Sequence, residues 1–429
     1  MRSPVVVLLL AAGCASKPAP SPPMAITETT TRTAEPVTSA AAPQPATALT
    51  PATALTPAPA DPADVAHENA LGWKLLEKTG RPGDNALVSG ASVRQALAPL
   101  LLGARGTTAD EMAQALGLDK DPTAAVMAEQ ATWHDAMGKH EAGAPAGVAL
   151  AVANRVWIDD GFVLLPDYAK TVGAAATVDF AKPETRATIN AWVSENTRAK
   201  IPELLPAGAV DGRTKLVVTN AIWFKGRWAL PFATTLTKDE PFKTGMKTVN
   251  VPTMHLADSF RYAASGGLRI LELRYADSQL AMDVILADDG KLPKIDPAKL
   301  DDATKGLASA RVSVSLPKLA FKSGAPLKDA LAALGMKTAF TDRADFSGMV
   351  DPKASEHLSI GQVFYQTWIA VDEAGTEAAA ATGMVMRTTA MQMGPVVDFK
   401  VDHPFVFVVR ETKNGRILFS GRVTDPKTL

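Results

Sequence analysis

The chain has 429 residues, of which 47% are hydrophobic and 21% are charged, and its formal net charge is −1. The apolar fraction excludes a wholly disordered chain, and the near-zero charge argues against a nucleic-acid binder, which usually carries a basic face. The single cysteine excludes an internal disulfide and a cysteine-based zinc site, so its position becomes informative.

The first predicted element is a secretion signal over residues 1–16. Arg2 supplies a positive start, residues 5–12 are apolar, and small residues lead into Cys14. The apolar run is far shorter than the ~20 residues that a membrane-spanning helix needs. The pattern resembles a bacterial lipoprotein signal, in which the cysteine is lipidated and becomes the new N-terminus. The alternative is an ordinary secretion signal with an incidental cysteine.

Residues 17–63 are predicted to be a disordered tether. They consist mainly of proline, alanine, threonine and serine, and residues 45–50 are repeated at 51–56. Such a segment cannot bury enough apolar surface to offset the entropy of ordering it, and its prolines favour extended conformations. It would hold a folded domain away from a membrane. A plain flexible terminus predicts the same structure without an anchor.

Residues 64–429 contain no second break of this kind and are predicted to form one large domain. In chain order, apolar spacing and composition predict helices over 66–78, 92–102 and 109–116, a strand over 148–158, a helix over 187–198, strands over 216–224, 270–275, 281–287 and 312–316, a helix over 327–334, and strands over 366–371, 399–409 and 417–423. Thr108 is the candidate N-cap of the third helix, and residues 413–415 form a hairpin turn. Early helices and late strands favour an α+β fold with antiparallel sheets.

Several short motifs are similar to those of enzymes, but none fits its enzyme family. Residues 315–318, 243–245 and 194–196 match the Ser-x-x-Lys, Lys-Thr-Gly and Ser-x-Asn motifs of penicillin-recognising enzymes, but their order is wrong and Pro317 would interrupt the nucleophile helix. No nucleophile elbow, phosphate loop or dinucleotide fingerprint is present. None of the six histidines has a partner at metalloprotease spacing. We therefore expect neither an enzyme nor a metal or cofactor site.

The most informative segment is 371–395, which follows the predicted strand over 366–371. Read as a strand, its even-numbered residues from Thr376 to Met386 carry no charge, while the odd-numbered set carries charges only at its ends, Glu377 and Arg387. Small side chains in this alternation minimise the steric resistance to entering a preformed sheet. The pattern is that of an exposed loop able to insert between existing strands.

Residues 373–382 resemble the hinge of the serpins, a family of suicide protease inhibitors. Further segments resemble the family in the family's order: 85–92, 102–117, 219–232, 251–255, 316–318, 344–348, 403–405 and 421–423. The resemblance covers nearly all of 64–429. It implies an α+β serpin fold with three β-sheets, eight to nine helices and an exposed reactive loop.

The resemblance also implies a mechanism. A target protease cleaves the loop, the loop inserts as a new strand of the main sheet, and the acyl-linked protease is carried along and distorted. The hinge residues that match inhibitory members are Glu373, Gly375, Thr376, Glu377, Ala378, Ala379, Ala380, Ala381 and Thr382. Counting from the hinge places the reactive bond at Thr389–Ala390, and the alternatives are Arg387, Met391 and Met393.

The resemblance assigns a second group of residues to the region where the main sheet opens: Ser89, Ser92, Asn220, Trp228 and Tyr365. Tyr365 replaces the family's usual histidine, and its larger ring puts the usual hydrogen bonds in question. Gly90 replaces a proline.

The expected function is inhibition of a serine protease, or of a cysteine protease, by a monomer. The expected location is the cell envelope of a bacterium, after secretion across the inner membrane and with lipid at Cys14 as the only membrane contact, or the extracellular space. The alternative function is a non-inhibitory serpin-fold binding protein.

Overall fold

The computed structural model describes residues 61–81, 83–118, 148–172, 175–276, 278–351, 357–376 and 395–427. Cys14, the predicted signal and nearly all of the predicted tether lie outside these ranges, as does most of the predicted reactive loop. Residues 53–429 form one unit. Among the described helices, none is both long and apolar enough to cross a lipid bilayer.

The first helices pack against one another and against the strands. Helices α1 (Pro62–Lys78), α2 (Gly90–Gly103) and α3 (Gly106–Leu116) carry their apolar residues into one core, as the sequence predicted. Asp61 and Ser89 cap the first two helices through their side chains, and Gly117 ends the third in a left-handed conformation. Arg105, not Thr108, is the N-cap of α3. Thr108 lies inside the first turn, where its hydroxyl accepts a hydrogen bond from the Asp345 amide.

The larger sheet has nine strands, and most of its pairs are antiparallel. Its path is β1 (Ala86–Val88), β15 (Ile417–Val423), β14 (Phe405–Glu411), β8 (Leu280–Ala287), β7 (Leu268–Arg274), β6 (Thr248–Ser265), β9 (Ala308–Pro317) and β13 (Val397–Lys400), with β5 (Lys238–Lys243) pairing on β6. The hairpin predicted at 413–415 joins β14 to β15, with Gly415 at positive φ.

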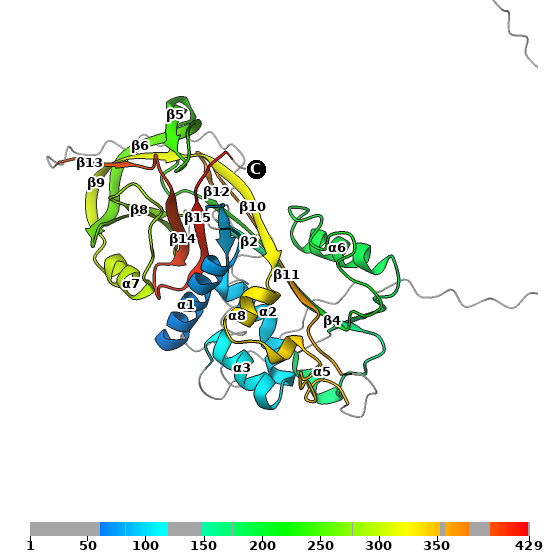
Figure 1. Ribbon diagram of the computed structural model, residues 1–429. Coiled ribbons are helices and arrows are strands. Elements are labelled where there is room, and N and C mark those ends of the chain that lie inside the picture. The colour runs from blue at the N-terminus through cyan, green and yellow to red at the C-terminus, as the bar shows by residue number, and fades with distance from the viewer. Residues whose placement is uncertain are drawn as a thin grey trace, which may run out of the picture. The chain divides into compact units, whose positions relative to one another are not determined.

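The smaller sheet has six strands and carries the site. Its order is β10 (Leu319–Pro326), β11 (Gln362–Val371), β12 (Gly375–Thr376), β4 (Leu216–Arg227), β2 (Val148–Asp159) and β3 (Ala176–Val178). β11 and β4 also pair directly with each other, in parallel. Figure 1 shows β10 and β11 side by side along this sheet, with α6 (Thr185–Asn196) beside them.

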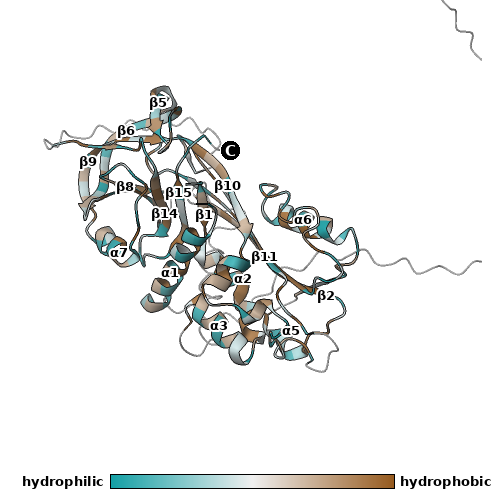
Figure 2. Cartoon of the chain, in the orientation of Figure 1, coloured by the Kyte–Doolittle hydropathy of each residue, from teal (hydrophilic) through white to brown (hydrophobic). Residues whose placement is uncertain are grey.

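Alternating side chains of β4 decide what covers each face of the smaller sheet. Ile222 and Phe224 enter a core shared with the larger sheet, whereas Val217 and Ala221 enter a separate core with Ile189 and Val193 of α6. Figure 2 shows hydrophobic brown along the strands and teal patches on α6. β4 is therefore buried on both faces.

The remaining described helices are α5 (Pro166–Val172), α7 (Pro297–Lys305) and α8 (Lys328–Ala333), with short 3-10 turns at Thr234–Leu236 and Thr338–Phe340. The described residues thus hold seven α-helices rather than the expected eight to nine, and two hydrogen-bonded sheets rather than three. The sheets number two because the 18-residue β6 pairs with β5 and β9 and also with β7, which joins two expected sheets into one.

Two further expectations differ from the structure. The strand predicted over 399–409 is two strands, β13 and β14, separated at Pro404, and β13 pairs in parallel with β9. The sheets are also not purely antiparallel, because β11–β4, β2–β3 and β13–β9 are parallel pairs. The α+β class itself is confirmed.

Candidate functional site

The candidate site begins where the chain leaves β11 and turns back into the same sheet. Val371 pairs with Thr376 across this turn, and on the other side of β12 the partners are Gly375 with Arg227 and Thr376 with Gly226. β12 is antiparallel to both neighbours. Two residues of the predicted hinge, Gly375 and Thr376, therefore already lie between β11 and β4.

Asp372 and Gly375 make this turn possible. The Asp372 side chain accepts hydrogen bonds from the amides of Ala374, at 2.9 Å, and of Gly375, at 3.1 Å, as aspartate does in tight turns. Gly375 has a φ of +154°, and a Cβ at this position would collide with the Gly226 carbonyl. A glycine at 375 thus allows the backbones of β12 and β4 to approach closely.

Glu373 anchors the turn to two distant segments. Its carboxylate accepts hydrogen bonds from Lys318 Nζ and from the Thr237 hydroxyl, both at 2.7 Å. Burial alone would raise the pKa of Glu373, but these donors outweigh it and hold the pKa below its usual value. Glu373 is therefore ionised at neutral pH and ties the hinge to Lys318, between β9 and β10, and to the segment after β4.

Trp228 closes the turn from the end of β4. Its backbone amide donates to the Ala374 carbonyl at 2.9 Å, and its indole N–H donates to the Asp372 carbonyl at 3.0 Å. The indole also stacks on Tyr275, with ring centroids 4.7 Å apart. Trp228 thus lies beside the turn that leads from β11 into β12.

Thr376 is fully buried, and its hydroxyl lies 2.7 Å from the Tyr275 hydroxyl. Burial raises the pKa of Tyr275, so the phenol stays protonated and can share a hydrogen bond at any physiological pH. Gly226 leaves room for the Tyr275 ring, because a Cβ there would lie 2.5 Å from it. Tyr275 lies at the end of a predicted strand, and no motif in the sequence singles it out.

Four of the five residues predicted for the sheet-opening region lie together beneath β11 and β4. Asn220 donates to the Ser92 carbonyl at 2.7 Å, and Ser89 caps α2 by accepting from the Ser92 amide at 3.1 Å. The Tyr365 hydroxyl accepts from the Ser89 amide at 2.7 Å and donates to the Leu87 carbonyl at 3.4 Å. Trp228, the fifth, lies at the other end of β4.

Tyr365 accordingly bonds to the start of α2 rather than to Asn220, its direct neighbour in the sheet. Among the described residues, the buried Asn220 Oδ1 has no hydrogen-bond partner. Packing against α1 explains the glycine at position 90, because a Cβ there would lie 2.6 Å from the Gly72 backbone nitrogen. The two departures from the family pattern thus fit the packing of this chain.

The other predicted site residues lie outside the described part of the chain. These are Cys14, Glu377, Ala378, Ala379, Ala380, Ala381, Thr382, Arg387, Thr389, Ala390, Met391 and Met393. Their roles remain predictions. In the described ranges, one carboxylate group has oxygens close enough to share a metal ion, Asp159 with Asp160 and Asp179. Such groups are common without an ion, and no role is assigned to it.

Comparisons with known proteins agree with this geometry. Residues 66–426 match the family model described as serpin (serine protease inhibitor). The chain is 38% identical to a leukocyte elastase inhibitor of Sus scrofa, over 80% of this chain and 94% of that protein, and 34% identical to a serpin-like protein of Thermococcus kodakarensis, over 84% and 85%. The crystal structure of Serpin48 of Tenebrio molitor matches with a TM-score of 0.71 at 29% identity, over 85% of this chain and 97% of that one.

Proposed function

Because the chain belongs to the serpin family, we propose that it inhibits a serine-type endopeptidase as a suicide substrate rather than acting as an enzyme. In this proposal the protease cleaves the segment after Thr376. The freed loop then inserts between β11 and β4 and traps the acyl-linked protease. The observation that carries the proposal is β12, the two-residue strand that already occupies the upper end of this path.

The register of β12 predicts where the rest of the loop would go. Continuing its antiparallel pairing places residue 378 beside Phe224 and Ile369, and residue 382 beside Asn220 and Tyr365. The positions obtained by continuing the register along β4 and along β11 agree, because β11 and β4 pair with each other in parallel. Even-numbered loop residues would face the inter-sheet core, which suits the uncharged set that begins at Thr376.

Insertion of this kind has a thermodynamic driving force. It replaces one direct parallel pairing, from Gln362–Val217 to Trp368–Trp223, with two antiparallel ones. Each added backbone hydrogen bond contributes about 0.5–1.5 kcal/mol. The uncleaved protein would then be a kinetically trapped state, held by the loop's closure at both ends.

Continuing the register also bears on the reactive bond. Residue 386 would pair with Leu216, the first residue of β4, so residue 387 would lie just beyond the strand. Cleavage at Thr389–Ala390 would therefore free enough chain to fill the sheet, whereas cleavage at Arg387 would leave almost none to spare. We retain Thr389–Ala390 as the proposed bond, which mass spectrometry of the cleaved loop can test.

The decisive test is Thr376→Arg. A charge at a fully buried position costs several kcal/mol unless it is paired. We expect the variant to be cleaved as a substrate without forming an SDS-stable complex with an elastase-like or subtilisin-like protease. Glu377→Arg is the matched control, because position 377 already carries a charge and the continued register would place it on the opposite face. A Thr376→Arg variant that forms the complex at the wild-type yield would contradict loop insertion.

The family resemblance leaves a non-inhibitory binding protein as the second candidate. Its hinge would be expected to carry bulky or charged residues at even positions, and the fit of Thr376 against Tyr275 argues for the inhibitor. If no protease of a broad panel forms a stable complex while the loop is cleaved normally, the second candidate is favoured.

We further propose that the protein is lipid-anchored at Cys14 in a bacterial cell envelope. The support is the signal-like sequence of residues 1–16 and the proline-rich segment after it. Cys14→Ser should move the protein from the membrane fraction to the soluble fraction, as fractionation of expressing cells would reveal. A Cys14→Ser protein that stays membrane-bound would contradict the anchor and leave the inhibitory function unaffected.

A further inference from the structure

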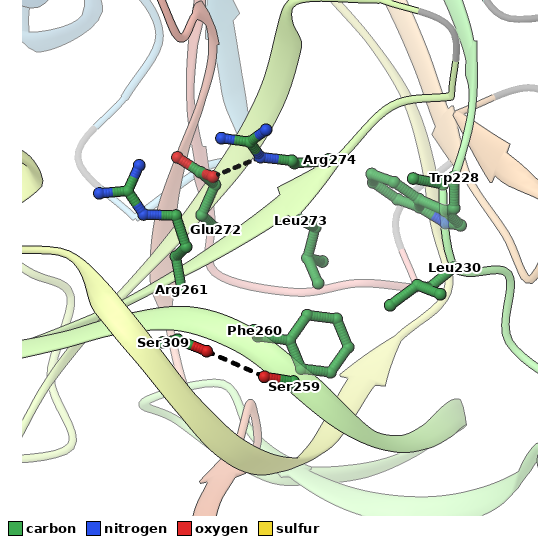
Figure 3. Close-up of a pocket in the computed structure, with 10 residues that line it drawn as sticks. Trp228, Leu230, Ser259, Phe260, Arg261, Glu272, Leu273, Arg274 and Ser309 are labelled. Atoms are coloured by element: carbon green, nitrogen blue, oxygen red, sulfur yellow. Dashed lines mark hydrogen bonds and ion pairs between the residues drawn. The ribbon is translucent and has the colours of Figure 1, made fainter. Parts of the chain in front are cut away.

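A cavity of about 250 Å³ lies where the end of β4 passes β6, β7 and β9. Figure 3 shows Trp228, Leu230, Phe260 and Leu273 grouped along it, with the charged side chains to one side. The cavity is accessible from solvent, because two of its lining residues, Ser259 and Ser309, are exposed. Their hydroxyls form a hydrogen bond with each other. The cavity is thus apolar on one side and ionic on the other.

The ionic side carries an excess of positive charge. Arg274 donates to one oxygen of the buried Glu272 at 2.9 Å, and Arg410 donates to its other oxygen at 2.8 Å. Arg410 also pairs with the buried Asp283 at 2.6 Å. Arg261 lines the cavity too, and in the described part of the chain it has no carboxylate within ion-pair distance. Its hydrogen bond goes to the Leu307 carbonyl at 2.7 Å. Among the residues that line the cavity, two guanidinium groups, Arg261 and Arg274, therefore face one carboxylate, Glu272.

From this geometry we propose that the cavity binds a small amphipathic carboxylate, with its apolar part against Trp228 and Phe260 and its carboxylate on Arg261 and Arg274. A charge-assisted pair with arginine is the strongest contact that this lining offers. The volume exceeds the ~150 Å³ that holds one benzene ring and lies below the ~300–1,000 Å³ of drug-sized sites. The ligand class is therefore one ring, or a short chain, carrying one carboxylate.

The same cavity touches the hinge through one side chain. Trp228, which forms its apolar wall, donates to Asp372 and stacks on Tyr275, the partner of Thr376. A ligand packed on the indole restrains the turn at residues 372–376 and opposes its movement. The effect of the ligand on the hinge rests on the proposed inhibitory function, whereas ligand binding to the cavity does not.

Binding is tested with 4-phenylbutyrate and its neutral analogue 4-phenylbutan-1-ol, titrated calorimetrically into the full chain. We expect the acid to bind at least about tenfold more tightly than the alcohol, since a charge-assisted hydrogen bond is roughly twice as strong as a neutral one. Arg261→Gln should remove most of this preference, and Leu230→Trp should block both probes by filling the cavity. Arg269→Gln is the matched control, because Arg269 lies on β7 but pairs with Asp288 and does not line the cavity.

Equal affinities for acid and alcohol would overturn the carboxylate site, as would equal losses of affinity in the Arg261→Gln and Arg269→Gln variants. An absence of binding by folded wild-type protein at millimolar probe would also overturn it. Coupling is read separately by amide hydrogen exchange at residues 372–376 and by the rate of protease-complex formation, both of which should fall when 4-phenylbutyrate is bound. Binding without any change in exchange refutes the coupling alone. Binding to a protein that forms no protease complex refutes the proposed function and leaves the site intact.

Discussion

The hydroxyl pair of Tyr275 and Thr376 is the contact that decides how firmly the hinge is held in the resting sheet. Both side chains are buried, and each hydroxyl satisfies the other at 2.7 Å. Loss of one partner leaves a buried polar group unsatisfied, at a cost of about 1–3 kcal/mol, whereas loss of both partners can be nearly neutral. This asymmetry makes the contact measurable.

We predict that Tyr275→Phe and Thr376→Val each lower the melting temperature of the uncleaved protein, while the double variant is more stable than their summed effects imply. The coupling between the two changes should be about 0.5–3 kcal/mol, the range for side chains in direct contact. Thermal melts of all four proteins in one buffer provide the measurement. Strictly additive effects would mean that the hydroxyl pair does not hold the hinge.

The partners of the hinge residues show what the sequence could and could not predict at this scale. The clustering of Ser89, Ser92 and Asn220 was predicted from the resemblance, and the structure brings them together. Sequence reasoning missed two partners of the hinge, Tyr275 for Thr376 and Lys318 for Glu373. Each partner lies at least 55 positions away in the chain, and no sequence motif indicates the contact. Pairings between distant segments are set by the tertiary fold.

At the scale of elements, the seam between β11 and β4 is covered by the residues that follow α6. The Arg198 guanidinium lies over Trp223 of β4 at 5.3 Å, and Lys200 lies over Trp368 of β11 at 5.0 Å. Trp223 and Trp368 are direct partners across the seam. Arg198 and Ala199 both have positive φ, which is strained for non-glycine residues. A strand entering along this seam must separate the two tryptophans, so these cation–π contacts must shift as it advances.

The same seam contains the unsatisfied Asn220 Oδ1, which the register places beside residue 382 after insertion. We predict that the Thr382 hydroxyl donates to this oxygen in the inserted form. Thr382→Val should therefore destabilise the cleaved protein by about 1–3 kcal/mol and leave the uncleaved protein unchanged. Guanidinium unfolding of both forms tests this, with Thr382→Ser as the variant that keeps the hydroxyl. Identical cleaved-form midpoints for the valine and serine variants would exclude the bond.

Element prediction succeeded where local patterns are strong. The helices α1 to α3 and the buried strands β4, β7 and β8 follow from apolar spacing and β-branched runs. The prediction of one strand over 399–409 was wrong, because Asp402 and Pro404 interrupt the run and its two halves pair with different strands, β13 with β9 and β14 with β8. β6 was missed because burial alternates irregularly along its 18 residues as its partners change.

At the scale of the whole molecule, the proposed reaction is a change in the connectivity of one sheet. The smaller sheet already has antiparallel β2–β4 and β10–β11 pairs on either side of its parallel seam. A loop inserted from Thr376 onward would make every neighbour pair from β10 to β2 antiparallel, while the β2–β3 pair and the larger sheet need not change. The free energy released on insertion would therefore come from the new strand pairs between β11 and β4. A comparison of stability before and after cleavage therefore tests loop insertion.

The last prediction follows from this. About ten new strand residues, at roughly 1 kcal/mol of net hydrogen-bond stabilisation each, amount to about 10 kcal/mol. At roughly 2 °C per kcal/mol for a protein of this size, loop cleavage should raise the melting temperature by about 20 °C or more. The protein is cleaved with a protease that nicks residues 377–394, freed of protease, and melted beside the uncleaved form. Thr376→Arg cleaved in the same way should show no such rise, because a charge at this buried position displaces residue 376 from the seam at which insertion starts. An unchanged melting temperature for the cleaved wild type would mean that the loop does not insert, and the chain would then be a serpin-fold binding protein.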